Sequence, residues 1–223
     1  MPDFLRRETV GDTMIGSAPP IRRTQRGEAR DMRLRRRAAE LFLERGYDGV
    51  SIDELVRDVG GSKASVYHFY GDKSGLFAVV MDDMLQDLAL PLGRLDLEGL
   101  SLAEGLTTFA TTLLAILLQP RHLAFHRLVI AEAQRRPAIG LSWYRNGPAA
   151  SCERLRRFLA AQQLLGQIRP EVVPEQAAVL FHDMVACTLL FRAMMTVEGG
   201  PTPEDVKRTI EQGVRLTLDG IVP

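Results

Sequence analysis

Residues 46–76, GYDGVSIDELVRDVGGSKASVYHFYGDKSGL, contain two short predicted helices separated by a pair of glycines. Ser51 and Glu54 have the spacing of a capping box, in which each side chain accepts a hydrogen bond from the other residue's backbone N–H. Apolar residues then follow at helical spacing and give the first helix one apolar face: Ile52, Leu55, Val56 and Val59. Gly60 and Gly61 are expected to end this helix, because glycine readily adopts the left-handed conformation common at helix C-termini.

The second helix is expected to run from Lys63 to about Phe69, with Ser62 as its N-cap. Val66 should face inward, together with Phe69 or Tyr70. The remaining side chains are small or can form hydrogen bonds, and they should face outward: Lys63, Ala64, Ser65, Tyr67 and His68. Two helices joined by a tight glycine turn are typical of a helix-turn-helix, the second helix of which enters a DNA groove.

The outward side chains of this second helix suit such a groove. Ala64 and Ser65 are small and allow the helix N-terminus to approach DNA closely. Lys63 and His68 can donate hydrogen bonds to bases or phosphates, and Tyr67 can donate its hydroxyl to a phosphate. The segment therefore predicts a DNA-contacting helix. The alternative interpretation is an ordinary surface turn between two packed helices.

A third helix should start at Lys73, with Asp72 as its N-cap. A cation is unfavourable at a helix N-terminus unless an anion lies close to it. A DNA phosphate at this end would compensate the charge. We therefore expect Lys73 to contact the DNA backbone.

The same segment resembles the DNA-binding domain of the TetR family of bacterial transcriptional regulators. The matching residues lie within about 28–80: Gly46-Tyr47, Ser51, Gly60, Ser62, Ala64-Ser65-Val66-Tyr67, Phe69-Tyr70, Lys73 and Leu76-Phe77. Three features depart from the family pattern: Gly61 replaces an aliphatic residue, Val56 and Val59 replace alanines, and Tyr70 stands where phenylalanine is common. The predicted DNA-contacting residues are Arg26, Ser51, Ser62, Lys63, Ala64, Ser65, Tyr67, His68 and Lys73.

Arginines are concentrated just before this segment, although the whole chain carries a net charge of zero. Residues 21–45 contain four acidic residues and nine arginines: Arg22, Arg23, Arg26, Arg30, Arg33, Arg35, Arg36, Arg37 and Arg45. Arginines at the front of a DNA-binding domain can neutralise phosphates. We expect DNA contact from Arg22, Arg23 and Arg26. Two interpretations remain for the arginines within residues 33–37: they contact DNA, or they form a solvated face of a helix.

The composition and the positions of prolines and glycines predict an all-α chain with three parts. Hydrophobic residues make up 46% of the 223 residues and aromatic residues only 6%. Residues 1–23 lack apolar periodicity and should form a disordered arm; residues 24–75 form the helix-turn-helix domain, and residues 76–223 an all-helical regulatory and dimerisation domain. Neither a signal peptide nor an apolar run of membrane-spanning length is expected. Cys152 and Cys187 imply no disulfide framework, so a bacterial cytoplasm is the expected location.

Beyond Phe77 the chain is predicted to consist of helices separated mainly by prolines and glycines. The expected helices are residues 73–90, ended by Pro91, then 101–119, 120–136, 148–166, 175–197 and a last helix from Pro201 or Pro203 to about 220. Residues 137–146 are polar and contain glycine. No helix is assigned to them, and they include the only tryptophan, Trp143.

The helix at 175–197 is apolar on nearly every side, so it must be buried on more than one face. We therefore expect it to form a four-helix interface, together with residues 204–219, with the same helices of a second copy. The predicted interface residues are Ala177, Phe181, Val185, Thr188, Leu189, Val206, Ile210 and Val214. The alternative is a central helix of a monomer. Resemblance to the TetR family implies a homodimer that binds operator DNA, usually as a repressor.

The middle helices are expected to enclose a regulatory pocket. The stretch RLVIAEAQRRPAIG and the residues after it resemble the AefR-like subgroup of regulatory domains. An apolar wall with a few polar points suits a small amphipathic effector. The predicted ligand-binding residues are Phe109, Leu113, Phe125, His126, Leu128, Glu132, Trp143, Tyr144, Phe158, Met184 and Phe191. Each aromatic residue among them is also a candidate for the ordinary core.

Two further hypotheses concern the histidines. His122 and His126 lie four residues apart on one helix, a spacing able to chelate zinc or nickel. The sequence does not identify a third metal ligand. The preferred interpretation is therefore that the two histidines are partly buried and bind no metal. A helical-bundle enzyme that uses His126, Glu132 or His182 is the alternative function. The sequence contains no nucleophile motif, phosphate-binding loop or paired-carboxylate helix signature, and no cofactor is expected.

Overall fold

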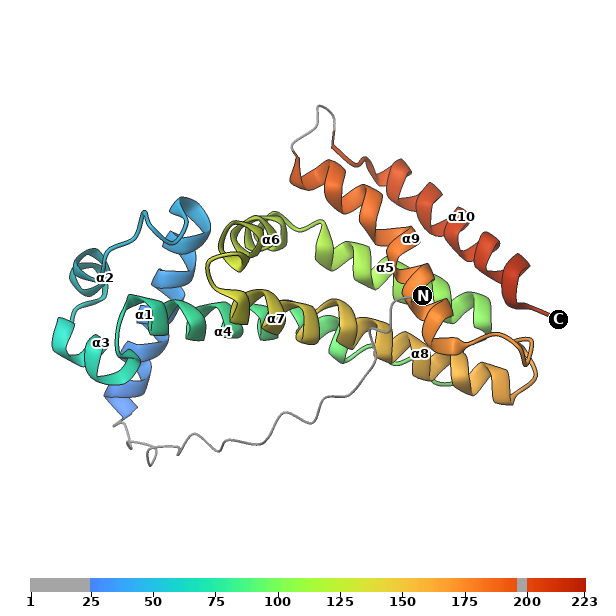
Figure 1. The fold of residues 1–223 in the computed structure, drawn as a ribbon, viewed down its shortest axis with the longest axis horizontal. Helices are drawn as coiled ribbons and strands as arrows, with labels where there is room; N and C mark the ends of the chain where they lie inside the picture. Colours follow the sequence, from blue (N-terminus) through green and yellow to red (C-terminus); the bar gives the residue numbers. More distant parts are fainter. Residues whose placement is uncertain (1–24, 196–199) are drawn as a thin grey trace.

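The computed structural model describes residues 25–195 and 200–223 (Figure 1). These residues form ten α-helices and no strand, which confirms the predicted all-α fold. The helices are α1 (Gln25–Arg45), α2 (Ile52–Val59), α3 (Lys63–Tyr70), α4 (Lys73–Gly93), α5 (Leu102–Leu117), α6 (Pro120–Ala133), α7 (Pro137–Asn146), α8 (Pro148–Leu164), α9 (Pro174–Met194) and α10 (Pro203–Ile221). The predicted disordered arm, residues 1–23, lies outside the described residues.

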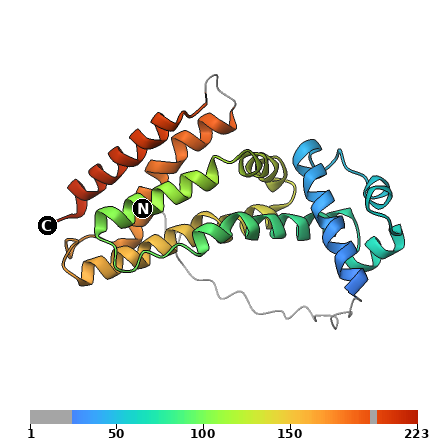
Figure 2. The same cartoon turned by 180° about the vertical axis from the view of Figure 1, so that it is seen from behind.

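The helices form an elongated molecule with a small unit at one end and a larger bundle at the other. Helices α1, α2 and α3 make the small unit, and α4 runs from it into the bundle of α5–α10 (Figures 1 and 2). Helices α9 and α10 pack side by side along one edge of the bundle. The division predicted between residues 75 and 76 falls inside α4.

The helix starts of the small unit agree with the sequence, with one exception. Ser51, Ser62 and Asp72 each accept a hydrogen bond from the backbone N–H three residues later. The capping box predicted at Ser51 is only half formed, because the Glu54 carboxylate instead accepts a hydrogen bond from Arg45 Nη1 at 2.6 Å. Complete capping boxes occur at the starts of α5 and α10.

The glycine pair after α2 explains one departure from the TetR sequence pattern. Gly60 has φ 71° and Gly61 has φ 140°. Residues with a side chain rarely adopt φ values in this region. The extra glycine therefore permits a turn conformation that the usual aliphatic residue would resist.

Two predicted helix boundaries were wrong. Pro91 lies within α4, which continues to Gly93. The overrun is short because proline removes one backbone donor and crowds the preceding turn. Residues 137–146 form α7, which begins with Pro137 at a position where proline's missing N–H costs nothing. Ile139 and Trp143 pack half-buried against the core and stabilise a helix whose sequence is otherwise polar.

Two hydrophobic cores hold the molecule together. One core joins α1–α3 to α4 and to Phe125, Leu128 and Val129 of α6. The other core is formed mainly by α5, α8, α9 and α10. Helices α4 and α6 therefore connect the small unit physically to the bundle.

Helix α9 is long and apolar enough to cross a bilayer, the one such helix among the described residues. The expectation that no apolar run reaches that length was therefore wrong. The helix packs against α5, α6, α8 and α10, and its buried side chains belong to the second core. Burial accounts for only part of its composition, because 39% of its apolar window is buried and its exposed side carries further apolar residues.

The interface residues predicted on α9 and α10 need correction. Five of the eight side chains are buried in the chain's own core and are not available to a second copy: Phe181, Val185, Leu189, Ile210 and Val214. Ala177 and Val206 are half-buried against the same core, and only Thr188 is exposed. The error arose because α9 is apolar all round, so its sequence does not reveal which face its own domain covers.

Candidate functional site

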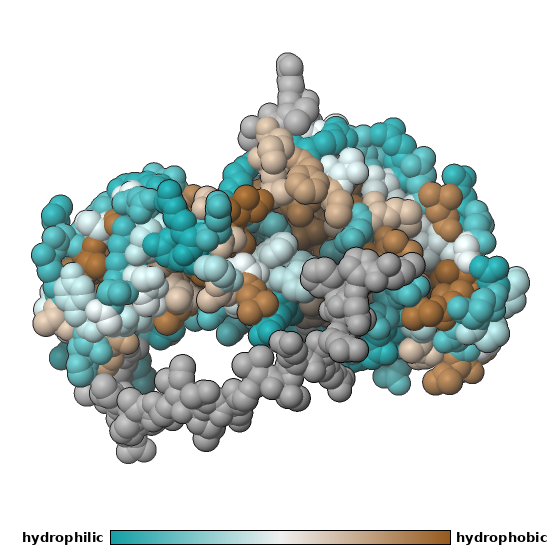
Figure 3. Space-filling model, viewed as in Figure 1, coloured by the Kyte–Doolittle hydropathy of each residue, from teal (hydrophilic) through white to brown (hydrophobic). Residues whose placement is uncertain are grey.

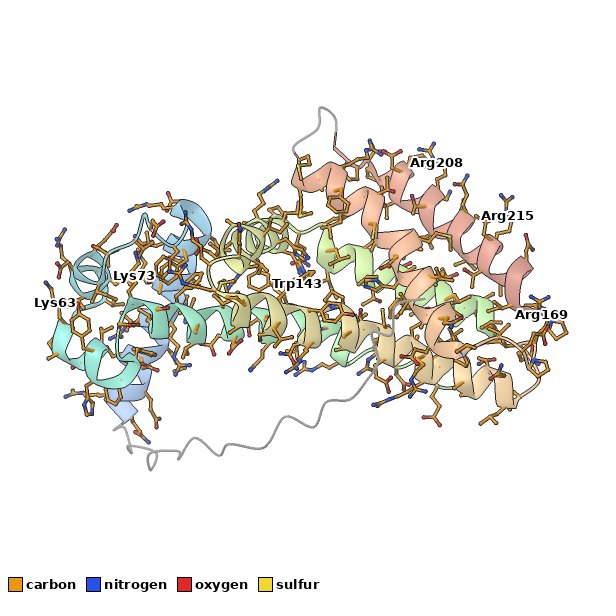
Figure 4. All side chains as sticks on the ribbon, in the orientation of Figure 1. Lys63, Lys73, Trp143, Arg169, Arg208 and Arg215 are labelled. Carbon is orange, nitrogen blue, oxygen red and sulfur yellow. The ribbon has the colours of Figure 1, made fainter. Side chains whose placement is uncertain are left out.

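The outer face of α3 is exposed, as predicted. Val66 turns inward and is 4% exposed, whereas Tyr67 is 49% exposed. The other predicted contact residues of the turn and helix are also exposed: Ser62, Lys63, Ala64, Ser65 and His68. Figure 4 places Lys63 at the outer end of the molecule, far from α10. The helix can therefore approach a large partner along this face.

Tyr70 anchors the back of α3 to the neighbouring helices. Its hydroxyl donates to Asp31 of α1, and Arg35 Nε donates to the same hydroxyl at 3.2 Å. Arg35 also donates to Asp31 and, through Nη1 at 3.1 Å, to Asp83 of α4. Burial is the main cause of a raised pKa for Tyr70, and the Asp31 contact adds to it. This network holds α1, α3 and α4 in one arrangement.

The arginines of α1 have two different roles. Arg35 belongs to the Tyr70 network, and Arg37 pairs with Asp58 of α2 at 2.8 Å. Both therefore contribute to the packing of the domain. Arg33 and Arg36 are exposed, as is Arg26 at the start of α1. Arg22 and Arg23, also predicted to contact DNA, lie outside the described residues.

Two predicted DNA-contacting cations already contact other groups of the domain. Lys63 forms an ion pair with Asp53 of α2, and both side chains are about half exposed. Lys73 Nζ lies 4.3 Å from the centre of the Tyr47 ring and 3.5 Å from the Asp48 carbonyl oxygen. Burial lowers the pKa of Lys73. A phosphate contact by Lys73 stays a prediction and would require the side chain to leave this position.

The Tyr47 ring is also the point where α6 reaches the small unit. The Arg136 guanidinium, just after α6, lies 3.5 Å from the centre of that ring. Arg136 is held there by an ion pair with Glu132, which is buried. The preceding residue, Arg135, pairs with Asp48 at 3.3 Å on the surface. The sequence-based site prediction missed Tyr47 and Arg136, because their contact joins distant parts of the chain.

A central cavity of about 520 Å³ lies among α4–α9. Five of the predicted ligand-binding residues line it: Leu113, His126, Trp143, Tyr144 and Phe191. Trp143, a residue of α7, lies near the centre of the molecule (Figure 4). Tyr144 and Phe191 are more than half exposed, so they lie where the cavity meets the surface. Figure 3 shows apolar residues on the face between α6 and α9.

The other six residues predicted for the pocket do not line the cavity. Phe109 and Phe158 belong to the second core, and Phe125 and Leu128 belong to the first. Glu132 is occupied by Arg136, and Met184 is exposed on the outer side of α9. Aromatic and apolar residues at helical spacing fill a core as readily as they line a cavity, so sequence could not separate the two roles.

His122 and His126 line the cavity but do not form a chelating pair. Their rings stack with centroids 4.7 Å apart and an interplanar angle of 29°. No group of three or more metal-ligating side chains occurs within the described ranges. Burial lowers the pKa of both imidazoles, that of His122 to about 3 with a contribution from His126. Both rings are therefore neutral at ordinary pH. The spacing of the two histidines is visible in the sequence, but His122 is not among the residues predicted for the pocket.

The exposed side of α9 carries a stripe of apolar residues. Leu180 is 70% exposed, Phe191 55% and Met195 62%. Met184 continues the stripe, and Leu216 of α10 is exposed as well. The outer edge of α10 is polar and bears Arg208 and Arg215 (Figures 3 and 4). The apolar stripe is defined here as Leu180, Met184, Phe191, Met195 and Leu216.

The chain matches two models of protein families. Residues 34–80 match the model of bacterial regulatory proteins of the tetR family. Residues 104–220 match the model of the C-terminal domain of AefR-like transcriptional repressors. The first match covers most of the helix-turn-helix unit, and the second covers the bundle from α5 to α10, which includes the apolar stripe and all of the cavity wall except its α4 part.

Individual proteins show the same similarity. The transcriptional repressor SCO4008 of Streptomyces coelicolor is 34% identical over 74 residues, which are 32% of this chain and 38% of that protein. The transcriptional regulator UidR of Escherichia coli (strain K12) is 23% identical over 188 residues, 83% of this chain and 89% of UidR. The solved structure of the flavonoid-responsive regulator FrrA is 28% identical and superposes with a TM-score of 0.74, covering 88% of this chain and 98% of FrrA.

Proposed function

Because this chain belongs to the TetR family of bacterial transcriptional regulators, we propose that it is a homodimeric repressor released from its operator by a small molecule. Three features support the proposal: the exposed face of α3, the apolar stripe and the central cavity. Family membership favours this function over the helical-bundle enzyme considered from the sequence.

The observation that carries the proposal is the exposure of α3 on a rigid support. Its polar face is open, while Val66 and Tyr70 fix its back to α1 and α4. A recognition helix held in this way can enter the major groove with its N-terminal residues at the base edges. Lys63 and Ser65 would then influence which sequence is preferred, and Tyr67 would contact a phosphate.

The apolar stripe supports pairing with a second copy. Exposed apolar residues in a contiguous patch mark interaction surfaces on soluble proteins. In the proposed dimer, the stripes of two copies pack together and form a four-helix interface from α9 and α10. Such symmetry places two α3 helices on successive major grooves, about 34 Å apart or a multiple of that distance.

The central cavity is the proposed effector site. Its volume lies in the range of small-molecule sites, and its wall is largely apolar. FrrA is described as flavonoid-responsive, which supports regulation by a small organic molecule here too. The protein would act in the bacterial cytoplasm, where operator DNA is found.

Helix α6 is the proposed connection between the cavity and the DNA. At one side, Arg127 Nε donates to the carbonyl of Met194, a residue of the cavity wall, at 2.9 Å. At the other side, Arg136 lies against Tyr47 of the small unit. An effector that shifts α6 would therefore move the small unit and alter the spacing of the two α3 helices. Release requires the effector to bind the two arrangements with different affinities.

A gel-shift experiment with the DNA flanking the protein's own gene tests the proposal. The expected result is specific binding by a dimer that weakens steeply as salt is raised, because phosphate contacts release counterions. A scrambled fragment of the same length is the control. Equal affinity for both fragments at all salt concentrations would contradict an operator-specific repressor.

A further inference from the structure

The polar groups of the central cavity differ in whether they already have partners. Arg154 donates from Nη1 to the Leu95 carbonyl at 2.7 Å and from Nη2 to the Gly93 carbonyl. Ser151 donates to the Pro148 carbonyl at 2.9 Å. These two side chains therefore serve the fold.

The histidines at the cavity are not equivalent. His182 Nδ1 lies 3.1 Å from Asp183, a mostly exposed carboxylate. His126 Nδ1 lies 3.2 Å from the His122 carbonyl and so must carry its proton. His122 Nδ1 is buried and has no hydrogen-bond partner among the described residues. His122 itself is only 8% exposed and lines the cavity.

The His122 ring packs against other rings. It stacks on His126, and Phe125 approaches both rings edge-on, with centroids 6.3 Å and 6.4 Å away. Trp143 lies edge-on to His126 at 5.3 Å. A buried polar atom without a partner is unfavourable in a folded protein. The ring lines the cavity and carries this buried, unpaired nitrogen, so it is suited to a hydrogen bond from a ligand once the ring turns the nitrogen toward the cavity.

We propose that the cavity binds an uncharged aromatic molecule of two or three rings whose hydroxyl group forms a hydrogen bond with Nδ1 of His122. This inference rests on the proposed role of the cavity as the effector site. The hydroxyl is favoured because it can both donate and accept, and so matches either tautomer of a neutral imidazole. The aromatic rings of the ligand would lie against Trp143 and the stacked imidazoles.

The charge of the cavity argues against an ionised ligand. The buried Glu132 is already paired with Arg136 and does not line the cavity. The cation on the wall, Arg154, is engaged by two carbonyl groups. The carboxylate on the wall, Asp183, is mostly exposed and lies 3.1 Å from His182 Nδ1. An anionic or cationic ligand would lose its hydration without gaining an unengaged buried partner of opposite charge among the described residues.

Calorimetry on the full-length protein tests this inference with three compounds: 2-naphthol, naphthalene and 2-naphthoate. We expect 2-naphthol to bind about 10- to 100-fold more tightly than naphthalene, because naphthalene leaves the His122 nitrogen unpaired. We expect 2-naphthoate to bind most weakly. Trp143 is the only tryptophan, so its single indole N–H resonance should shift when 2-naphthol enters the cavity.

Two histidine variants provide a matched comparison. His122→Phe keeps a ring of similar size but removes the nitrogen, so naphthol and naphthalene should bind about equally. His182→Phe makes the same change at another residue of the wall and should keep the preference for naphthol. The comparison of compounds on the unaltered protein stands even if one variant fails to fold.

Several outcomes would overturn the inference: equal binding of naphthol and naphthalene, tighter binding of 2-naphthoate, or no binding at millimolar concentration. A naphthol preference that survives in His122→Phe would overturn it as well. These results are independent of the gel shift. A protein that binds its operator but shows no hydroxyl preference contradicts only this inference, whereas a hydroxyl preference without specific DNA binding contradicts only the repressor function.

Discussion

At the residue scale, the same type of side chain has different roles according to its burial. His68 is exposed on α3, whereas His122 is buried beside a second imidazole. Tyr67 presents its hydroxyl to solvent, whereas Tyr70 uses its hydroxyl to tie α3 to α1.

The buried His122 should make the protein sensitive to acid. Its pKa is lowered from 6.5 to about 3, mainly by burial. Between these pH values the unfolded chain binds a proton that the folded chain does not, so stability falls as the pH drops through this window. The loss is up to about 1.4 kcal/mol per pH unit for one group. Urea unfolding of His122→Phe between pH 6.5 and 4 should show a shallower loss than the unaltered protein.

The exposed His68→Phe variant is the control for this measurement and should keep the steeper pH dependence. Carboxyl groups titrate in the same window, but they are common to all three proteins. Identical slopes for the unaltered protein and His122→Phe would show that His122 is not buried as a neutral imidazole.

Tyr67→Phe should weaken binding to operator and non-operator DNA by the same factor, about 3- to 10-fold, because it removes one hydrogen bond to a phosphate. Gel shifts with both DNAs measure the two affinities. Tyr144→Phe removes an exposed hydroxyl from the other half of the molecule and should bind DNA normally. A loss confined to the operator would instead indicate that Tyr67 contacts a base.

At the element scale, contacts between helices depend on a few close approaches. Arg136 joins α6 to the small unit through Tyr47. Gly105 of α5 lies so close to α8 that a Cβ atom would overlap the Phe158 ring. Gly213 of α10 similarly lets Val185 of α9 approach, since a Cβ there would lie 2.8 Å from Val185 Cγ1.

Arg136→Met should lower the free energy of unfolding by about 3 kcal/mol, because it leaves the buried Glu132 charge without a partner. The double variant Glu132→Gln/Arg136→Met should recover most of this loss. Arg135→Met removes an ion pair between exposed side chains and should change stability by less than about 0.5 kcal/mol. Chemical denaturation compares the three. A single variant as stable as the double would mean that Glu132 does not depend on Arg136.

Gly105→Ala should destabilise the protein by about 1–3 kcal/mol through overpacking against Phe158. Alanine normally stabilises a helix relative to glycine, so the sign of the effect identifies the close approach. Gly220 lies near the end of α10, and a Cβ atom added there would meet open space, so Gly220→Ala is the control. That control should be neutral or slightly stabilising in thermal unfolding. A stabilised Gly105→Ala protein would show that α5 and α8 can separate at little cost.

At the scale of the whole molecule, α3 lies at one end of an elongated chain, and α9 and α10, which carry the apolar stripe, lie in the bundle at the other end (Figure 1). A dimer formed through the stripe therefore leaves both α3 helices free to bind DNA. Dimer formation and DNA binding are therefore compatible. Helices α4 and α6 keep the apolar stripe and α3 apart in space, and they also connect the two parts of the molecule that carry them.

Leu180→Glu should shift the protein towards monomers, because two copies of a charge would be buried in the proposed interface. Sedimentation velocity measures the change, and operator affinity should fall at least 10-fold with the loss of paired α3 helices. Leu164→Glu introduces the same charge at a leucine that is 90% exposed at the end of α8 and should leave the dimer intact. A dimeric Leu180→Glu protein would place the interface elsewhere.

The sequence by itself determined the local features of this protein. The caps at Ser62 and Asp72, the glycine turn after α2 and the inward position of Val66 were predicted correctly, because each depends on residues within one or two helical turns. The same local pattern carried the resemblance to the TetR family. It failed at α7, where burial of Ile139 and Trp143 by other helices outweighed a polar sequence.

Only the tertiary structure decided which face of each helix is covered. Phe181 and Val185 were predicted to meet a second copy but fill the chain's own core, while Leu180 beside them is exposed. The cavity at His122 and the contact of Arg136 with Tyr47 join residues far apart in the chain. Helical periodicity states that a residue lies on an apolar face, but the neighbour that covers this face is set by how the helices pack.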